Sequence, residues 1–277
     1  MNLYDSVCIR CSRITTQRYS TSFTLGIRSL AARFRDPIYA IYGFVRFADE
    51  IVDTFHREDA HELLIEFRND TWKAIDRKVS LNPILHSFQQ AVNEYHIDRS
   101  LIETFLNSME MDVSEKTYDQ SGYEEYILGS AEVVGLMCLR VFCEGNDDMY
   151  QRLREPAMKL GSAFQKINFL RDLKNDYFTL GRMYFPQLEI DRFDENTKTE
   201  ILADIRRDFD AGFAGIKQLP KGARFGVYVA YVYYYALLNK ISNTPSARIL
   251  EERVRIPDAR KYALILQSFV RHQLNLI

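Results

Sequence analysis

Two pairs of aspartates, each spaced four residues apart, are the strongest chemical signal in the sequence. Asp49 and Asp53 lie in FVRFADEIVD, and Asp172 and Asp176 lie in FQKINFLRDLKND. On an α-helix, residues i and i+4 lie about 40° apart around the axis, so both carboxylates of a pair project from one face. The sequence therefore predicts two helices that each carry a narrow acidic stripe.

Gln165 and Asn168 extend the second stripe, and the other positions between 160 and 173 are mostly apolar. A helix that is apolar almost all round is normally buried, and buried carboxylates need cations. Oxygen ligands from two helices suit Mg²⁺, which commonly takes one or two carboxylates together with the phosphates of a substrate. We therefore expect a Mg²⁺ site, which Mn²⁺ could also occupy.

An acidic pair at this spacing is more often a solvated helix face, because acids are rarely buried. The first helix is a poor solvent face, however, since its two aspartates share a flank with Tyr42 and Arg46. One side of this helix is apolar and holds Ile41, Phe44, Val45, Ala48 and Val52. Because the arrangement occurs twice, we favour a site over two solvated faces.

Helical periodicity runs through nearly the whole sequence. The chain has only 12 Gly and 7 Pro in 277 residues, which favours long helices over a turn-rich β fold. Asp36-Pro37 and Asn82-Pro83 are typical helix starts, and Pro156 should break or kink the chain where the second acidic helix begins. We expect one all-α domain over residues 1–277, a bundle around a central cavity that both acidic helices face. Its helices are expected near 4–18, 37–55, 62–78, 83–95, 98–113, 121–143, 148–178, 197–218, 222–242 and 257–274.

Several classes of function lack support in the sequence. The net charge is −2 with no basic run, so we expect no nucleic-acid partner. Cys8 and Cys11 form a C-x2-C, but Cys138 and Cys143 do not complete a zinc pattern, so we expect ordinary thiols. No signal peptide is evident at the start, and the apolar stretch at 225–238 is too short to span a bilayer. A cytoplasmic location is expected.

A run of small residues adjoins the acidic helices in sequence. Gly129, Ala131 and Gly135 lie among Val and Leu residues, and glycine costs about 1 kcal/mol in a helix interior. Two explanations stay open, namely close helix packing and room for a hydrocarbon chain. The 18 Phe and 17 Tyr fit either, because most will form core while aromatic faces can also stabilise a carbocation.

Six pieces of sequence, spread over essentially the whole chain, occur together in one known order. They are Tyr19-Ser-Thr-Ser-Phe23, Tyr39-x2-Tyr42-x3-Arg46-x2-Asp49-x3-Asp53, Tyr126-x4-Ala131-x2-Val134-Gly135, Gln165-x2-Asn168-x2-Arg171-Asp172-x3-Asp176, Arg182-x-Tyr184-Phe185-Pro186 and Arg253-Val-Arg255. In these pieces the chain resembles the squalene/phytoene synthase family, most closely its bacterial phytoene synthases. The resemblance implies an isoprenoid-synthase helical fold and head-to-head condensation of two prenyl diphosphates.

The resemblance also implies roles for individual residues. By position, the metal ligands would be Asp49, Asp53, Asn168, Asp172 and Asp176. Catalysis would rest on the four aspartates and Tyr126, which with Gly135 would border the tail cavity. The residues that bind substrate would be Tyr19, Ser20, Thr21, Ser22, Tyr42, Arg46, Gly135, Gln165, Arg171, Arg253 and one of three consecutive tyrosines, of which Tyr234 fits best.

The substrate that this resemblance favours is geranylgeranyl diphosphate, two molecules of which would give phytoene through a cyclopropyl diphosphate. Phytoene forms by loss of a proton, so no nicotinamide cofactor is expected. The enzymatic alternative is a squalene or dehydrosqualene synthase that acts on farnesyl diphosphate. Departures from the family pattern at Tyr19, Leu128, Glu132 and Asn175 leave the donor length open.

A hypothesis of another class is a non-catalytic relative that acts as an assembly protein. It is disfavoured because such a fold has no evident need to bury four unpaired acids. Because substrates and product carry long hydrocarbon chains, we expect a soluble protein or one held peripherally at the inner membrane surface. The sequence leaves the oligomeric state open.

Overall fold

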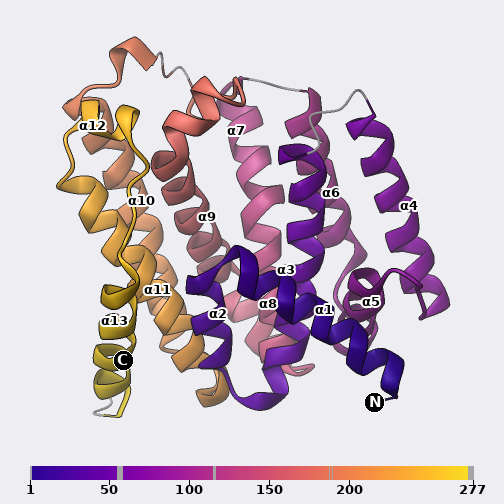
Figure 1. Cartoon of the computed structure of the whole chain (residues 1–277). Helices are drawn as coiled ribbons and strands as arrows, with labels where there is room; N and C mark the ends of the chain where they lie inside the picture. The colour runs from indigo at the N-terminus through magenta and orange to yellow at the C-terminus, as the bar shows by residue number, and fades with distance from the viewer. Residues whose placement is uncertain (1, 55–58, 115–116, 187, 189, 274–277) are drawn as a thin grey trace.

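The computed structural model describes residues 2–54, 59–114, 117–186, 188 and 190–273. Within these residues the chain is helical nearly throughout, and the one strand-like feature is an isolated bridge between Thr117 and Met183. The predicted all-α fold is confirmed (Figure 1). The elements are α1 Leu3–Tyr19, α2 Thr21–Arg28, α3 Ala32–Asp53, α4 Ala60–Arg77, α5 Pro83–Tyr95, α6 Arg99–Ser114, α7 Gln120–Ile127, the π-turn η1 Leu128–Glu132, α8 Val133–Cys143, α9 Asp147–Phe178, the 3₁₀ turn η2 Ile190–Arg192, α10 Glu195–Ile216, α11 Lys221–Ser242, α12 Ser246–Glu251 and α13 Asp258–Gln273.

The helix-start signals in the sequence explain where α5 begins but not where α3 begins. Asn82 caps α5 as predicted, because its side chain accepts hydrogen bonds from the backbone N–H groups of Ile84 and Leu85. The prediction for the first acidic helix was wrong at its start, since α3 begins at Ala32 and Pro37 lies inside it. Tertiary contacts override the local signal there: the Ala31 N–H donates to the Gly222 carbonyl at 2.8 Å.

The second acidic helix occupies the expected range of 148–178 to within one residue, but it is not broken at Pro156. Helix α9 runs through Pro156 without interruption, so the predicted break is absent. The α10 backbone at Gly215 makes room for the proline, since a Cβ built there would lie 2.4 Å from the Pro156 Cβ. The expected helix 121–143 is likewise one helical run, but it contains the π-turn at 128–132.

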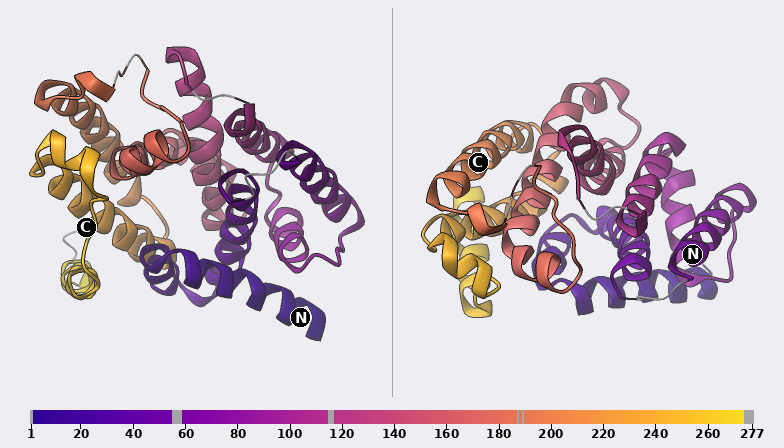
Figure 2. Two further views of the ribbon diagram at one scale, coloured as in Figure 1. Left: turned by 45° about the horizontal axis from the view of Figure 1, so that its top comes forward. Right: turned by 90° about the horizontal axis from the view of Figure 1, so that it is seen from above.

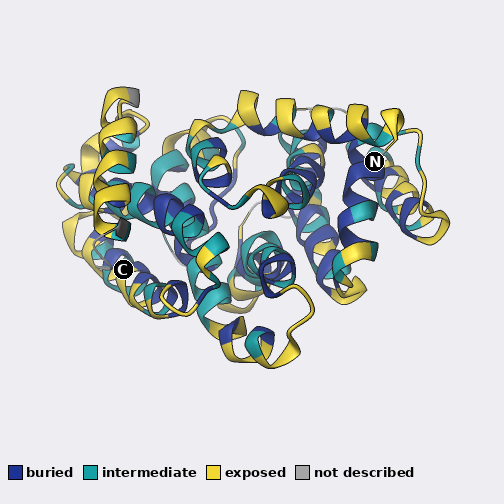
Figure 3. Cartoon of the chain, turned by 90° about the horizontal axis from the view of Figure 1, so that it is seen from below, coloured by how far each residue is buried: buried dark blue, intermediate teal, exposed yellow. Residues whose placement is uncertain are grey.

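The buried side chains form two clusters that flank the acidic helices. One joins α1, α3 to α6 and α8, and includes Phe44, Phe88 and Phe105. The other joins α7 and α9 to α12, and includes Ile205 and Phe209. In Figure 2 the helices surround a central region, and Figure 3 shows that their outward faces carry the exposed residues. The acidic half of α9 packs in the second cluster, whereas Tyr150 and Leu153 near its start pack in the first cluster together with α3.

One helical run within the described residues is long and apolar enough, by length and composition, to cross a membrane. It is Gln120–Cys143, with a mean hydropathy of 1.6 over its most apolar window. The stretch at 225–238 is therefore not the most apolar long segment. Some 56% of the window is buried inside the protein, and Leu136 and Met137 lie in the core, so the run packs as a core helix.

Candidate active site

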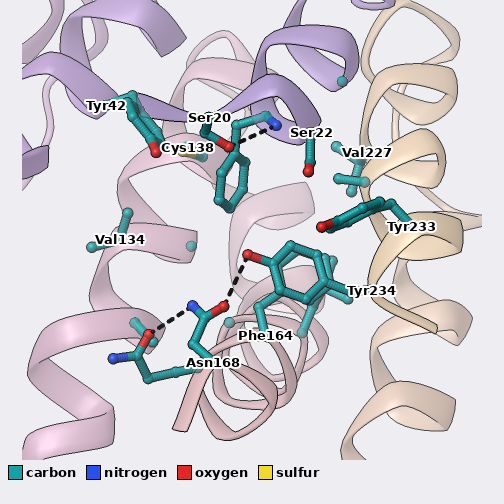
Figure 4. A pocket seen from close by; sticks show the side chains of 18 of the residues that line it. Ser20, Ser22, Tyr42, Val134, Cys138, Phe164, Asn168, Val227, Tyr233 and Tyr234 are labelled. Atoms are coloured by element: carbon teal, nitrogen blue, oxygen red, sulfur yellow. Dashed lines mark hydrogen bonds between the residues drawn. The ribbon is translucent and has the colours of Figure 1, made fainter. Parts of the chain in front are cut away.

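A cavity of about 880 Å³ opens between the N-terminal and C-terminal helices. Its wall combines α2, α3, α8, α9 and α11 with a segment that we call the strap, residues 252–257. The close-up in Figure 4 shows Tyr42 and Ser20 facing Asn168 and Tyr234 across this space. The cavity gathers most of the predicted site residues: Tyr19, Ser20, Thr21, Ser22, Tyr42, Arg46, Asp49, Tyr126, Gly135, Gln165, Asn168, Arg171, Tyr234 and Arg253.

The deeper part of the cavity is apolar. Its lining includes Ile27, Leu30, Leu139 and Phe142. A site of this size and character is typical of pockets that bury a largely hydrocarbon ligand. The structure therefore separates a polar end, where the charged residues lie, from an apolar end.

The glycines of the predicted small-residue run serve mainly close packing. A Cβ on Gly129 would lie 2.6 Å from the Thr104 carbonyl oxygen, and Gly129 does not line the cavity. Gly135 serves both purposes, because a Cβ there would lie 2.9 Å from the Ala157 carbonyl while the residue also lines the cavity. Thus α8 approaches α9 closely at the cavity wall.

Asp53, Asp172 and Asp176 lie outside the cavity lining, at its acidic edge. On α3, Asp53 accepts a hydrogen bond from Arg182 Nη1 at 2.8 Å. On α9, Asp172 is ion-paired with Arg253 of the strap at 2.5 Å and with the neighbouring Arg171 at 2.6 Å. Two of the four acids are therefore paired, which corrects the expectation of four unpaired carboxylates.

The other two acids lack such strong pairing. Asp49 lies 3.6 Å from Arg46, which also forms an ion pair with Glu50. Burial raises the pKa of Asp49 to about 7, with repulsion from Asp53 adding to the shift and Arg46 opposing it. Burial likewise raises the pKa of Asp176 to about 8, and both Asp172 and Asp53 add to that shift. The repulsion between Asp53 on α3 and Asp176 on α9 thus connects the two helices electrostatically.

The donor set fits a hard cation whose coordination is completed by a ligand. Among the described residues, no group of three or more His, Cys, Asp or Glu side chains lies close enough together to hold an ion. A bound divalent cation would nonetheless relieve the mutual repulsion of these buried carboxylates. Mg²⁺ commonly takes one or two carboxylates and completes its shell with water and phosphate oxygens. The carboxylates of Asp49 and Asp176 and the amide oxygen of Asn168 suit that chemistry.

The wall contributed by α9 is ordered by hydrogen bonds between its own polar residues and α11. The Tyr234 hydroxyl donates to Asn168 Oδ1 at 3.3 Å, and Asn168 Nδ2 donates to Gln165 Oε1 at 3.3 Å (Figure 4). Tyr233 also lines the cavity, whereas Tyr235 packs against Phe209, 5.7 Å between ring centroids. Two of the three consecutive tyrosines therefore face the site.

Tyr19 and Arg46 stack at the edge of the polar end. The Arg46 guanidinium carbon lies 4.3 Å from the Tyr19 ring centroid, which is a cation–π contact. The Arg46 Nε is buried without a hydrogen-bond partner within the described residues. An unsatisfied buried donor of a guanidinium is unfavourable, and an anionic ligand would satisfy it.

A buried polar network behind the site was missed by the sequence analysis. Asp112 on α6 accepts hydrogen bonds from Tyr126, Tyr184 and Tyr118, at 2.6, 3.0 and 3.2 Å. Arg182 lies beside it and joins it to Asp53. Arg182 and Tyr184 stood in a quoted motif without a role, and the single Asp112 within an ordinary helical pattern gave no signal.

Comparison with known proteins agrees with this geometry. The model of the squalene/phytoene synthase family matches residues 16–260. The chain belongs to the squalene/phytoene synthase family, whose members are prenyltransferases that act on prenyl diphosphates.

Relatives with different products match at similar identity. A 15-cis-phytoene synthase of Synechococcus elongatus is 27% identical, over 94% of this chain and 92% of its own. A phytoene synthase of Cereibacter sphaeroides is 27% identical over 80% of this chain and 68% of its own. A presqualene diphosphate synthase of Rhodopseudomonas palustris is 30% identical, over 60% of this chain and 58% of its own.

Solved structures agree on the fold. A dehydrosqualene synthase in complex with a ligand superimposes with a TM-score of 0.83, covering 97% of this chain and 98% of its own at 20% identity. A squalene synthase from Alicyclobacillus acidocaldarius superimposes with a TM-score of 0.75, covering 91% and 97% at 17% identity. The predicted isoprenoid-synthase helical fold is therefore confirmed.

Proposed function

We propose that the protein is a phytoene synthase, which joins two geranylgeranyl diphosphates head to head through a cyclopropyl diphosphate and requires Mg²⁺. The observation that carries the proposal is a single cavity with a carboxylate- and arginine-lined end and an apolar interior. A prenyl diphosphate has the same division between a charged head and a hydrocarbon tail.

The twenty-carbon donor is favoured by the relatives that match most of the chain. The phytoene synthase of Synechococcus elongatus aligns over 94% of it, whereas the presqualene diphosphate synthase of Rhodopseudomonas palustris aligns over 60%. Farnesyl diphosphate is the second candidate, because the dehydrosqualene synthase superimposes over nearly the whole chain. A non-catalytic role stays the third, and the uncompensated Asp49 and Asp176 argue against it.

The side chains at the polar end suit departure of a diphosphate. Arg46 and Arg171 line the cavity and supply fixed positive charge, and Arg253 reaches the same edge from the strap. Bound between Asp49, Asp53, Asn168, Asp172 and Asp176, Mg²⁺ would neutralise the leaving group. The apolar interior excludes water from the allylic cation that remains, and Phe164 and Tyr234, whose ring centroids lie 4.1 Å apart, add aromatic surface to the wall.

The proposed function is tested by identifying the hydrocarbon that the purified protein makes. Geranylgeranyl diphosphate and farnesyl diphosphate are supplied separately with Mg²⁺, each with and without NADPH. We expect phytoene from the twenty-carbon donor, in an amount that NADPH does not change, because loss of a proton needs no hydride donor. A product that appears only with NADPH, or only from farnesyl diphosphate, would overturn the phytoene assignment.

We further propose that the protein works at the surface of an anionic membrane, through the outer face of α13. Tyr262, Leu266, Phe269 and Val270 are 60, 65, 46 and 49% exposed and lie along one side of this helix. Figure 2 (left) shows α13 end-on at the outer margin of the C-terminal helices. Arg260 and Arg271 add positive charge to α13, which complements anionic lipid headgroups.

The position of α13 connects this face with the cavity. The strap leads directly into α13, and Lys261 of its first turn lines the cavity. Docking of α13 on a bilayer would therefore bring the cavity close to the lipids in which substrate and product dissolve.

Vesicle flotation tests the location. We expect binding to vesicles of phosphatidylcholine with phosphatidylglycerol and much weaker binding to phosphatidylcholine alone. Leu266→Glu should abolish binding, whereas Leu81→Glu, at a residue 93% exposed before α5, should leave it unchanged. Equal binding by both variants would contradict the proposal, as would a protein that only detergent extracts from membranes.

A further inference from the structure

Asp112 is a buried carboxylate that accepts three tyrosine hydroxyls. The oxygen distances are 2.6 Å to Tyr126, 3.0 Å to Tyr184 and 3.2 Å to Tyr118. Asp112 is 7% exposed and lies on α6, while its three partners come from α7 and from two loop segments. A buried carboxylate with this many neutral donors is satisfied without a fully neutralising ion pair.

Of the three tyrosines, Tyr126 alone lines the cavity. Burial raises the pKa of its phenol well above the usual 10, so the hydroxyl keeps its proton. Because this proton is donated to Asp112, only the lone pairs of the Tyr126 oxygen remain for other partners. The pKa of Asp112 is raised by burial to about 6, so its carboxylate is ionised and accepts hydrogen bonds at neutral pH.

We propose that Asp112 is a positioning residue for the condensation: it holds the hydroxyl proton of Tyr126, so that Tyr126 offers the cavity an oxygen that can only accept. A hydrogen-bonded carboxylate also makes that phenol oxygen more electron-rich. An oxygen on the cavity wall that presents only lone pairs stabilises the positive charge of an allylic cation, whereas a hydroxyl hydrogen pointing into the cavity would repel that charge. This inference rests on the proposed function, and it adds a residue on α6 that none of the six motifs contains.

A purely structural role for Asp112 gives different kinetics, so a mutant cycle separates the two. In Asp112→Asn, the amide group competes as a donor, and we expect kcat to fall about 100-fold with KM within about threefold of wild type. In a Tyr126→Phe background the same substitution should lower kcat by less than about fivefold, because residues that act as a unit are non-additive. Tyr118→Phe is the matched control, since it removes a phenol from Asp112 but not from the cavity wall, and should stay within about threefold.

Three kinetic results would overturn the proposal. These are an Asp112→Asn variant within threefold of wild type, an equal loss in both backgrounds, and a Tyr118→Phe variant as impaired as Tyr126→Phe. Rates are measured well below each variant's midpoint of thermal unfolding, so a change in stability alone does not count.

The hydrogen bond is also measurable without turnover. In protein labelled with ¹³C at tyrosine Cζ and dissolved in mixed H₂O and D₂O, a slowly exchanging hydroxyl gives a split resonance. We expect splitting for Tyr126, assigned by its loss in Tyr126→Phe, and a single averaged line in Asp112→Asn. A single line in wild type, or a split line in Asp112→Asn, would refute the proposal. Should wild type turn over neither prenyl diphosphate, the proposed function fails and this measurement still decides whether Asp112 holds the proton.

Discussion

The two acidic helices carry the same pair of carboxylates but neutralise them differently. On α3, Asp53 is paired with Arg182, whose side chain is only 8% exposed and also donates to the Val52 carbonyl at 2.9 Å. On α9, Asp172 is paired with Arg253, whose side chain is 46% exposed and belongs to the strap. Each helix then leaves one acid, Asp49 or Asp176, with a raised pKa.

This difference in pairing indicates that the α3 side and the α9 side of the site have different roles. Arg182 is fixed between Asp53 and the network around Asp112, so the α3 side is set when the chain folds. Arg253 belongs to the strap, which is held by Lys240 through the Arg255 carbonyl and, just before its start, by Lys174 through the carbonyl of Glu251 at the end of α12, both at 2.6 Å. An arginine at an exposed pair can exchange its carboxylate for an anionic ligand at little free-energy cost. We therefore expect the α3 side of the site to be fixed in the folded protein and the α9 side, with the strap, to respond to the substrate.

The largest expected effect comes from removing one carboxylate from each helix. Asp49→Asn and Asp172→Asn should each lower turnover by about a thousandfold or more, because both would serve the one proposed metal–diphosphate assembly. The double variant should lose little beyond either single one. Steady-state rates measure this, with circular dichroism to confirm folding, and near-normal activity in either folded single variant would refute the shared site.

Removing the arginine that pairs with α3 and removing the one that pairs with α9 should change protein stability by different amounts. Arg182→Ala leaves the buried Asp112 and the partly exposed Asp53 without their cation, so we expect a loss of about 3–5 kcal/mol of stability. Arg253→Ala opens an exposed pair and should change stability by at most about 1 kcal/mol, while raising KM for the diphosphate. Denaturant unfolding and kinetics on both variants provide the comparison, and equal destabilisation would show that the two pairs are equivalent.

Asp176 should destabilise the metal-free protein at alkaline pH. Its pKa is raised from 3.8 to about 8 on folding, so the folded state binds the proton more tightly and stability falls as pH rises between these values. Asp176→Asn should therefore stabilise the metal-free fold by about 1–3 kcal/mol at pH 9, and much less at pH 4. Thermal unfolding with a chelator at both pH values measures the effect. A destabilised variant at pH 9 would contradict the sign.

The smallest effect distinguishes the two tyrosines of the α9 side. Tyr234→Phe removes the hydroxyl that donates to Asn168 and should lower turnover about tenfold, while Tyr233→Phe should stay within about threefold. The ratio of the two rates is the informative quantity. If Tyr233→Phe were the more impaired, the hydrogen bond to Asn168 would not be what orders this wall.

Helical periodicity predicted the fold class and the two acidic helix faces, because amphipathic spacing is a local signal set within a few turns. The other residues of the cavity wall came from the resemblance to a known family. The start of α3 at Ala32 and the unbroken α9 were not predictable in that way. The start of α3 depends on the Gly222 carbonyl, which accepts a hydrogen bond from the backbone just before the helix. The unbroken α9 depends on Gly215, whose missing Cβ makes room for the proline inside the helix.

The pairing of the acids was also beyond the sequence. Asp53 and Arg182 are 129 residues apart, and no periodic pattern connects them. Asp112 stands alone in its segment, and its three tyrosines converge only through the packing of α6 and α7 with the loops that carry Tyr118 and Tyr184. Residues whose contacts form only in the folded structure have no characteristic spacing in the sequence.

The central claim, that α3 and α9 form one metal–diphosphate site, is tested most directly by ligand-dependent thermal unfolding with inorganic pyrophosphate. Mg²⁺ and pyrophosphate together should raise the unfolding midpoint of the wild-type protein, because a ligand that binds only the folded state stabilises it. Either alone should raise it far less. Asp49→Asn and Asp172→Asn should each abolish the combined shift, whereas a full shift in either variant would show that the two helices do not share the site.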